Sequence, residues 1–292
     1  MVVVPALAPS VRVASTARRS RVAPALVDAA WLASRIGEVV VLDVRRGAEF
    51  QGGTIPGARS LPLATLLVTD TARPAVQAFA QTVQRTLAAL GVAPDDEVVL
   101  IDDADGCAAL SAVLCELAGL HRVSVVAGRG VRDWAALGGP ITPGGVRDID
   151  AVSVERWAGV PASFRGIAAF EDVVDAVTHH TAQIVDVRSQ LEHEGILGST
   201  CCAARGAITG SVHLEWTAFL DAGGHPRSAE RVRTIAEHVG LHVDAPVILA
   251  CHAGHRAAVA ALALRAAGFV DVRVSIGSWH DWAARGLADD DA

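Results

Sequence analysis

Cys251 and Arg256 are the two residues whose types and spacing most directly indicate a catalytic site. They bound the segment Cys251-His-Ala-Gly-His-Arg256, which separates an apolar run at 247–250 from an Ala- and Leu-rich stretch that ends at Gly268. The apolar run predicts a buried strand, and the stretch that follows predicts a helix over 256–267. The sequence therefore places a thiol between the end of a strand and the start of a helix.

This position favours a reactive thiolate at Cys251. Main-chain N–H groups at the start of a helix are unpaired, and together with the helix dipole they stabilise an anion. Only four residues separate Cys251 from Arg256, and Gly254 is one of them, so several N–H groups are expected to converge on the sulfur. A thiolate in such a place is a nucleophile at cellular pH. We predict Cys251 as the catalytic residue, the alternative being a buried cysteine that only packs.

The polar residues of the same loop each allow two interpretations. Arg256 either holds an anionic substrate or is a helix-start residue paired with Asp186 or Glu192. His252 and His255 either bind an anion when protonated or are solvated loop residues. Cys-x3-His spacing is a weak metal pattern, and without a second cluster of ligands no metal site is expected. The candidate substrate-binding loop comprises Cys251, His252, Ala253, Gly254, His255 and Arg256.

Length and composition are those of an ordinary globular protein. The 292 residues suffice for about two domains, with 51% hydrophobic and 20% charged residues. A net charge of −7 gives no reason to expect nucleic acid or an anionic membrane as partner. No apolar run is long enough to predict a membrane span. Small molecules or proteins are the expected partners.

The cysteine content and the N-terminal segment bear on localisation. The 5 cysteines lack the spacing of a disulfide framework, so a reducing cytoplasm is expected. Residues 1–22 are basic and contain no acidic residue, and their apolar and basic parts are in the reverse order for a secretory signal. A disordered tail is expected there, with a transit peptide as the alternative.

The two halves of the chain repeat the same landmarks in one order. The Asp-Val-Arg motif at 43–45 recurs at 186–188, and the apolar run ending at Asp102 corresponds to the run that precedes Cys251. Such a pattern indicates a duplicated fold. In the first copy, strands are expected near 39–42, 98–101 and 123–126 and helices near 72–90 and 107–118. This alternation predicts an α/β fold, a parallel sheet with helices on both faces, and ligands bind beyond the carboxyl ends of such strands.

The boundary between the copies is expected in the Gly- and Pro-rich stretch 138–145, which favours neither a helix nor a central strand. The predicted organisation is a tail at 1–22, a first copy at 23–141, a linker at 142–165 and a second copy at 166–292. Because Asp186 and Cys251 both follow strands of the second copy, we expect them at the same edge of its sheet.

Three motifs in combination resemble the rhodanese family of sulfurtransferases. They are the Asp-Val-Arg motif with a later Gly-x-Ile-x-Gly turn, the strand-Cys-x-x-Gly-x-Arg-helix loop, and Gly-Ser-Trp-x-x-Trp at 277–282. The resemblance covers nearly all of residues 26–287 and is closest to the two-domain branch. It implies two tandem rhodanese-like domains, the first inactive, and transfer of a sulfane sulfur from thiosulfate or 3-mercaptopyruvate. A persulfide on Cys251 would pass the sulfur to cyanide or a thiol, without a cofactor.

The chemistry of the residues agrees with an inactive first copy and an active second copy. Asp102 stands where the second copy has Cys251, and a carboxylate cannot store sulfur as a persulfide. We therefore expect the first copy to be catalytically silent and to cover one side of the active cleft. Asp186 and Arg188 are expected to form a supporting pair that holds the backbone of the cysteine loop through charge-assisted hydrogen bonds.

The length of the loop distinguishes among related activities. Cysteine phosphatases and arsenate reductases of related fold use Cys-x5-Arg to wrap a tetrahedral oxyanion, whereas this chain has Cys-x4-Arg. The shorter loop suits a single persulfide sulfur, and phosphatase or arsenate reductase activity is the weaker alternative. A sulfur-carrier or redox-sensing module without rapid turnover is a second alternative.

Two departures from the family pattern bear on the donor. Many two-domain members carry an arginine where this chain has Glu192, and single-domain members resemble it there. The loop does not match the Cys-Gly-Ser/Ala-Gly-Val/Thr-Thr pattern of mercaptopyruvate enzymes, and its final Arg256 is more similar to the thiosulfate type. Thiosulfate is the expected donor.

Cys201 and Cys202 lie in a segment inserted before the Gly206 turn. If this segment folds over the active rim, either thiol would accept sulfur from Cys251 or form a disulfide with it. Incidental loop cysteines are the favoured interpretation. Four further residues are expected to pack rather than to react: Cys107, Cys115, Trp279 and Trp282.

Overall fold

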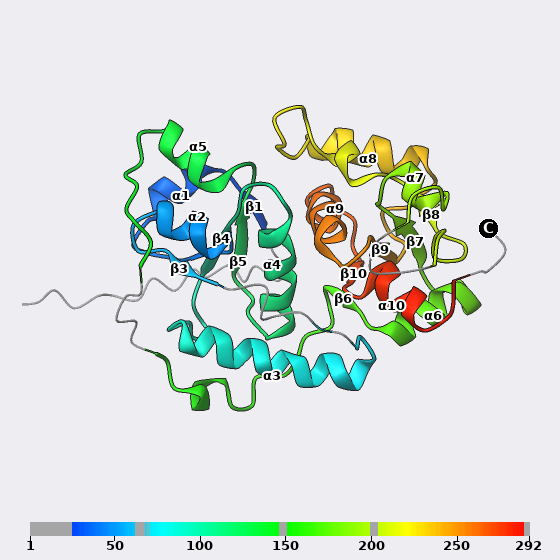
Figure 1. Ribbon diagram of the computed structural model, residues 1–292, viewed down its shortest axis with the longest axis horizontal. Helices are drawn as coiled ribbons and strands as arrows, with labels where there is room; N and C mark the ends of the chain where they lie inside the picture. Colours follow the sequence, from blue (N-terminus) through cyan, green and yellow to red (C-terminus); the bar gives the residue numbers. More distant parts are fainter. Residues whose placement is uncertain (1–24, 62–67, 69, 146–150, 199–203, 289–292) are drawn as a thin grey trace, which may run out of the picture.

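The chain forms two α/β units side by side in the computed structural model (Figure 1). The structure describes residues 25–61, 68, 70–145, 151–198 and 204–288. The expected tail at 1–22 and the pair Cys201 and Cys202 lie outside these residues. None of the described helices is long and apolar enough to cross a membrane.

The first unit contains a five-stranded sheet in the order β1-β5-β4-β2-β3, with every neighbouring pair parallel. Its strands are β1 (Ala25–Val27), β2 (Val40–Asp43), β3 (Arg59–Ser60), β4 (Val98–Ile101) and β5 (Val123–Val126). Its helices are α1 (Ala29–Arg35), α2 (Gly47–Gly52), α3 (Arg73–Ala89), α4 (Cys107–Leu117) and α5 (Gly130–Ala136). A 3-10 helix, η2 (Val154–Trp157), precedes the second unit.

The second unit repeats this topology strand for strand, in the order β6-β10-β9-β7-β8. Its strands are β6 (Ile167–Ala168), β7 (Gln183–Asp186), β8 (Val212–His213), β9 (Val247–Ala250) and β10 (Val272–Ser275). Its helices are α6 (Phe170–His179), α7 (Gln190–His193), η3 (Trp216–Phe219), α8 (Ala229–His238), α9 (His255–Ala266) and α10 (Ser278–Ala284). The predicted fold class, two duplicated parallel-sheet units, is confirmed.

The central strands explain where the site lies. All four residues of β9 are buried, as expected for a strand whose sheet is covered on both faces. β9 lies between β10 and β7, and Asp186 at the end of β7 is in register with Ala250 at the end of β9. Asp186 and the residue after Ala250, which is Cys251, therefore share one edge of the sheet, as the sequence predicted.

Helix bounds differ from the predicted ones by a residue or two. The helix expected at 256–267 is α9, which begins at His255 because Gly254, with φ of +88°, takes the N-cap position. The helices expected at 72–90 and 107–118 are α3 and α4. The ranges predicted for the two copies and the linker remain predictions.

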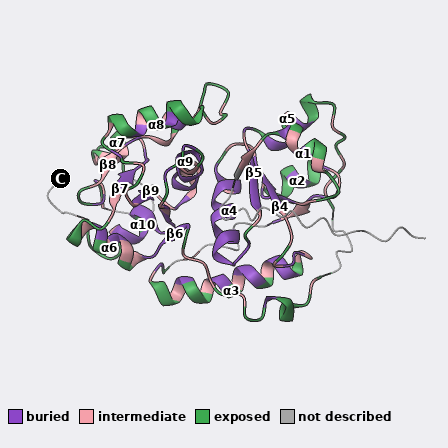
Figure 2. Ribbon diagram, turned by 180° about the vertical axis from the view of Figure 1, so that it is seen from behind, coloured by how far each residue is buried: buried purple, intermediate pink, exposed green. Residues whose placement is uncertain are grey.

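Two small-residue helices, α4 and α9, pack against each other at the junction of the units, and Figure 2 shows both as largely buried. Every residue of α4 after Cys107 is buried, and most of α9 is buried alanine and leucine. Alanine allows two helix backbones to approach closely, so the two units share one continuous hydrophobic core. The junction therefore packs like a domain interior.

A buried ion pair crosses this junction. Arg265 on α9 donates from Nη1 to Glu116 Oε2 on α4 at 3.2 Å, and their side chains are 11% and 4% exposed. Burial raises the pKa of Glu116, and the charge of Arg265 opposes that rise. Arg265 also donates to the carbonyl of Val272, so the guanidinium is held from both sides. The two residues occupy equivalent positions in the duplicated units.

Candidate active site

Cys251 lies directly after β9, and its thiol faces the start of α9. The Gly254 main-chain N–H donates to Cys251 Sγ at 3.1 Å, because the left-handed conformation of Gly254 turns its amide back toward the sulfur. Among the described residues this is the main-chain donor recorded at the sulfur, where the sequence predicted several. Cys251 is 2% exposed, whereas His252, Ala253, His255 and Arg256 are partly exposed. The thiol therefore lies at the base of a loop whose rim meets solvent.

The cysteine loop is held by Ser278 and the start of α10, a contact that the sequence did not predict. Cys251 N–H donates to Ser278 Oγ at 3.0 Å, and that hydroxyl donates to the carbonyl of Ser275. The amides of Trp279 and His280 donate to the carbonyls of Cys251 and His252 at 3.0 and 3.1 Å. These bonds tie the cysteine loop to the start of α10. The Gly-Ser-Trp-x-x-Trp motif at 277–282 contains Ser278, but from the sequence it indicated only the family.

Arg256 is paired with Glu192, one of the two interpretations that the sequence allowed. Its Nη1 and Nη2 donate to the two carboxylate oxygens of Glu192 at 2.7 and 2.8 Å. The hydrogen bond from Arg256 is the main reason that the pKa of Glu192 falls to about 2. Glu192, and to a smaller extent the charge of Cys251, raises the pKa of Arg256. The guanidinium therefore stands between a fixed carboxylate and the sulfur.

Asp186 and Arg188 form the expected buried pair, but the pair holds a different segment. Arg188 Nη2 donates to Asp186 Oδ2 at 2.6 Å and to the carbonyl of Gly206 at 2.6 Å. The expectation that this pair holds the backbone of the cysteine loop is wrong, because β7 is the neighbouring strand and its end faces the Gly206 turn. In the first unit, Arg45 likewise bonds Asp43 and the carbonyl of Gly53. A role in holding the turn explains why both units keep the motif.

The two loop histidines are neutral at pH 7. Burial lowers the pKa of His255 below its ordinary value. Burial also lowers the pKa of His252, with further contributions from the charges of His280, Arg256 and Arg188. The interpretation that these imidazoles bind an anion when protonated is therefore disfavoured near neutral pH.

Four further residues pack as expected: Cys107, Cys115, Trp279 and Trp282. Cys115 is fully buried on α4 and Cys107 is half-buried at its start, and burial raises the pKa of both thiols to about 12. Trp279 and Trp282 are buried, and the Trp279 ring lies 4.9 Å from the Arg188 guanidinium. In the described part of the chain, no three His, Cys, Asp or Glu side chains are arranged to hold a metal.

The first unit lies against the cysteine loop on one side. A Cβ built on Gly254 would come within 3.2 Å of Leu110 Cδ1 on α4 and of the Ile276 carbonyl oxygen, and the φ of +88° also favours glycine there. Thr71 donates through its hydroxyl to Asp281 on α10, and Asp70 binds Arg285 at 2.7 Å. These contacts hold the first unit beside the cysteine loop and α10.

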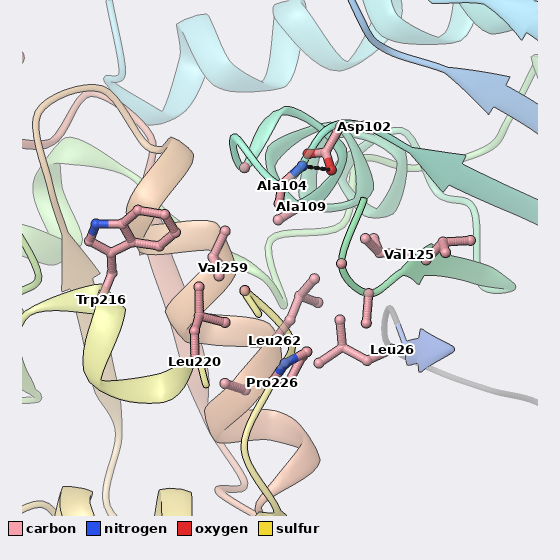
Figure 3. A pocket seen from close by; sticks show the side chains of 16 residues that line it. Leu26, Asp102, Ala104, Ala109, Val125, Trp216, Leu220, Pro226, Val259 and Leu262 are labelled. Carbon is pink, nitrogen blue, oxygen red and sulfur yellow. Dashed lines mark hydrogen bonds between the residues drawn. The ribbon is translucent and has the colours of Figure 1, made fainter. Parts of the chain in front are cut away.

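The equivalent loop of the first unit is filled by its own carboxylate. Asp102 accepts from the amides of Ala104 and Ala108 at 2.9 and 2.8 Å, at the start of α4. Figure 3 shows Asp102 beside a mostly apolar cavity of about 50 Å³ between the units, which Trp216 and Leu262 also line. Burial raises the pKa of Asp102 to about 7. The main-chain N–H groups of this loop thus bind the Asp102 carboxylate, which cannot carry sulfur.

Asp102 is expected to make the stability of the protein fall as pH rises. Its pKa is about 7 in the folded state and about 4 in an unfolded chain. Its stabilising contribution is therefore complete below about pH 4 and is lost as pH rises through about 7. From about pH 5 to about pH 8, the wild type should lose roughly 2–3 kcal/mol more unfolding free energy than Asp102→Ala.

Urea unfolding at several pH values measures this difference. Asp244→Ala, which removes an exposed carboxylate from the second unit, is the matched control and should keep the wild-type pH dependence. An Asp102→Ala variant with the same pH dependence as the wild type would show that Asp102 is ionised in both states.

Comparison with known proteins agrees with the duplicated fold. A model of the rhodanese-like domain matches residues 28–137 and 170–285. The thiosulfate sulfurtransferase of Azotobacter vinelandii is 27% identical over 270 residues, which cover 89% of this chain and 94% of that protein. Human 3-mercaptopyruvate sulfurtransferase is 27% identical over 285 residues, with 91% and 86% covered.

A solved structure agrees in fold. The crystal structure of SseA from Escherichia coli, a 3-mercaptopyruvate sulfotransferase, is similar with a TM-score of 0.69 and 24% sequence identity. The similarity covers 88% of this chain and 99% of that one. Each of the two matched segments contains four of the five strands of one parallel sheet, all but β1 in the first and all but β6 in the second. The chain therefore belongs to the rhodanese-like family, with two copies of the domain in tandem.

Proposed function

We propose that the protein is a sulfurtransferase that moves a sulfane sulfur from thiosulfate or 3-mercaptopyruvate to a thiol or cyanide through a persulfide on Cys251. The observation that carries the proposal is the placement of Cys251 Sγ 3.1 Å from the Gly254 amide at the start of α9. Relatives named for both donors match most of the chain.

The reaction has two steps. In the first, the Cys251 thiolate attacks the outer sulfur of thiosulfate, a new S–S bond forms, and the original S–S bond breaks with its electrons leaving on sulfite. In the second, the acceptor attacks the outer sulfur of the Cys251 persulfide and releases the thiolate. Each step exchanges one bond to sulfur for another, so no external oxidant or cofactor is needed.

The residues around the sulfur suit both steps. The thiolate and the persulfide each carry negative charge, which the Gly254 N–H, the start of α9 and the Arg256 guanidinium stabilise. Ser278 holds the amide of Cys251 and so fixes the direction of the thiol. The first unit closes one side of the site and contributes no sulfur chemistry of its own.

The geometry offers no support for a phosphatase. The loop has one residue fewer than the Cys-x5-Arg loop that wraps a tetrahedral oxyanion, and the two Nη atoms of Arg256 each donate one hydrogen bond to Glu192. We propose the cytoplasm as the compartment, because the reaction needs a free thiol at Cys251 and a reducing environment keeps thiols free.

Intact-protein mass spectrometry tests the proposal. After incubation with thiosulfate or 3-mercaptopyruvate and removal of the donor, the protein should gain the mass of one sulfur atom. Addition of cyanide should return the original mass and release one equivalent of thiocyanate. If neither donor adds sulfur to the protein, the proposed function is wrong. If the sulfur is added but no acceptor removes it, the protein is a carrier rather than an enzyme.

A further inference from the structure

The rim of the catalytic loop carries a carboxylate in a fixed orientation. Besides its two hydrogen bonds from Arg256, Glu192 accepts from the amide and the hydroxyl of Ser189 at 3.1 and 2.8 Å. Ser189 is the N-cap of α7, so the carboxylate is anchored to a helix start as well as to the loop. The side chains of Glu192 and Arg256 are 24% and 26% exposed, which leaves this pair in contact with solvent and with an incoming substrate.

The charge of Arg256 is consequently not available in full to a bound anion. The pKa of Glu192 is about 2, because Arg256 and Ser189 stabilise its ionised form. The carboxylate is therefore charged at every physiological pH, and the pair as a whole is neutral. An ion pair with both ends held attracts a third charge far less than a free guanidinium does.

No other charge in the loop makes up the difference. His252 and His255 are neutral at pH 7, since burial lowers the pKa of each. Arg188 is 3% exposed and is committed to Asp186. Among these described neighbours of Cys251, the positive and negative charges cancel. The net charge of the site is therefore that of the thiolate.

We propose that Glu192 determines donor specificity by disfavouring doubly charged donors relative to donors with one negative charge or none. The inference rests on the proposed function, because it concerns the donor of the same Cys251 site. Thiosulfate, a dianion, meets the Glu192 carboxylate and the thiolate together and is accepted only at a high KM. A small persulfide R–S–SH with an uncharged R group carries at most one negative charge and therefore meets less of this repulsion.

The persulfide reaction balances without a further reagent. The Cys251 thiolate attacks the outer sulfur of R–S–SH, the new S–S bond forms, and the old S–S bond breaks. The electron pair leaves on R–S⁻, and the proton stays on the transferred sulfur as Cys251–S–SH. Sulfur is exchanged between two thiols with no net oxidation or reduction.

Steady-state kinetics of the full chain with two donors tests the proposal. The probes are thiosulfate and the persulfide of 2-mercaptoethanol, with cyanide as the acceptor in both assays. Glu192→Gln removes the charge but keeps an oxygen to accept from Ser189. It should lower the KM for thiosulfate about tenfold with little change in kcat, and leave the KM for the persulfide unchanged.

Glu194→Gln is the matched control. Glu194 is an exposed carboxylate two residues away that accepts from Gln190 Nε2, and its replacement should leave both KM values unchanged. An unchanged ratio of kcat/KM for the two donors in Glu192→Gln would overturn the proposal. Equal losses with both donors would also overturn it, because Glu192 would then only support Arg256. A wild type that gains no sulfur from either donor would instead refute the proposed function.

Discussion

Replacing Cys251 by serine is expected to lower the rate of sulfur transfer by about 10⁴-fold or more. Serine is nearly isosteric and can still accept from the Gly254 amide. Its hydroxyl is not ionised near neutral pH, and an oxygen cannot hold the transferred sulfur as a persulfide. Thiocyanate formation from thiosulfate and cyanide measures the rate, and intact mass shows whether sulfur is bound at all.

Cys107→Ser is the control for the general effect of removing a thiol. Cys107 stands at the start of α4, the position equivalent to the start of α9, but burial raises its pKa to about 12 and keeps it protonated. This variant should retain wild-type turnover and gain one sulfur atom by mass. A Cys251→Ser protein that still acquires sulfur and turns over would place the reactive thiol elsewhere in the chain.

Replacing Arg265 by methionine is expected to cost about 3–5 kcal/mol of unfolding free energy. The methionine fills the space of the arginine stem but leaves Glu116, 4% exposed, without its counter-charge at the junction of the two units. Without Arg265, the pKa of Glu116 should rise further, since Arg265 opposes the effect of burial. The loss of stability should therefore be greatest at high pH, where Glu116 must ionise. Urea unfolding at several pH values measures both effects.

Two further variants separate the charge from its burial. The double variant Arg265→Met/Glu116→Leu removes both charges and should recover most of the lost stability, because the desolvation cost disappears with the pair. Arg156→Met breaks an ion pair with Asp95 whose side chains are 55% and 70% exposed, and it should cost at most about 1 kcal/mol. If Arg265→Met is no more costly than Arg156→Met, the junction is open to water.

The duplicated fold and the place of Cys251 were predictable because they depend on local patterns. Short apolar runs predict buried parallel strands, and the repeated Asp-Val-Arg motif shows the duplication without any tertiary contact. The same logic placed Asp186 and Cys251 at one edge of the sheet. Register between β7 and β9 confirms that placement.

The supporting contacts were harder to predict because they join distant parts of the chain. Ser278 lies 27 residues after Cys251 and bonds its amide, and the Gly-Ser-Trp motif that contains Ser278 does not by itself show which group the hydroxyl binds. Arg256 had two possible carboxylate partners, and the choice of Glu192 depends on how α7 leaves the sheet. The Asp186 and Arg188 pair was predicted, but its target required knowing that the Gly206 turn lies above β7.

The amino-acid sequence contains an indication of the helices that form the junction between the units. α9 is rich in alanine on all of its faces, which indicates a helix surrounded by protein rather than one with a solvent face. Its partner α4 is buried in the same way. The sequence thus marked the two helices that meet, although their mutual contact was not deduced.

The ion pair between Glu116 and Arg265 has a consequence for the origin of the molecule. The two residues are 149 positions apart, the same separation as Gly119 and Gly268 at the ends of their helices. In a homodimer of identical protomers, a residue on the two-fold axis faces its own copy, so a glutamate would meet a glutamate and an arginine an arginine. Opposite charges at this point require that the protomers differ. A single chain that carries both copies permits this difference, because each copy can change without the other.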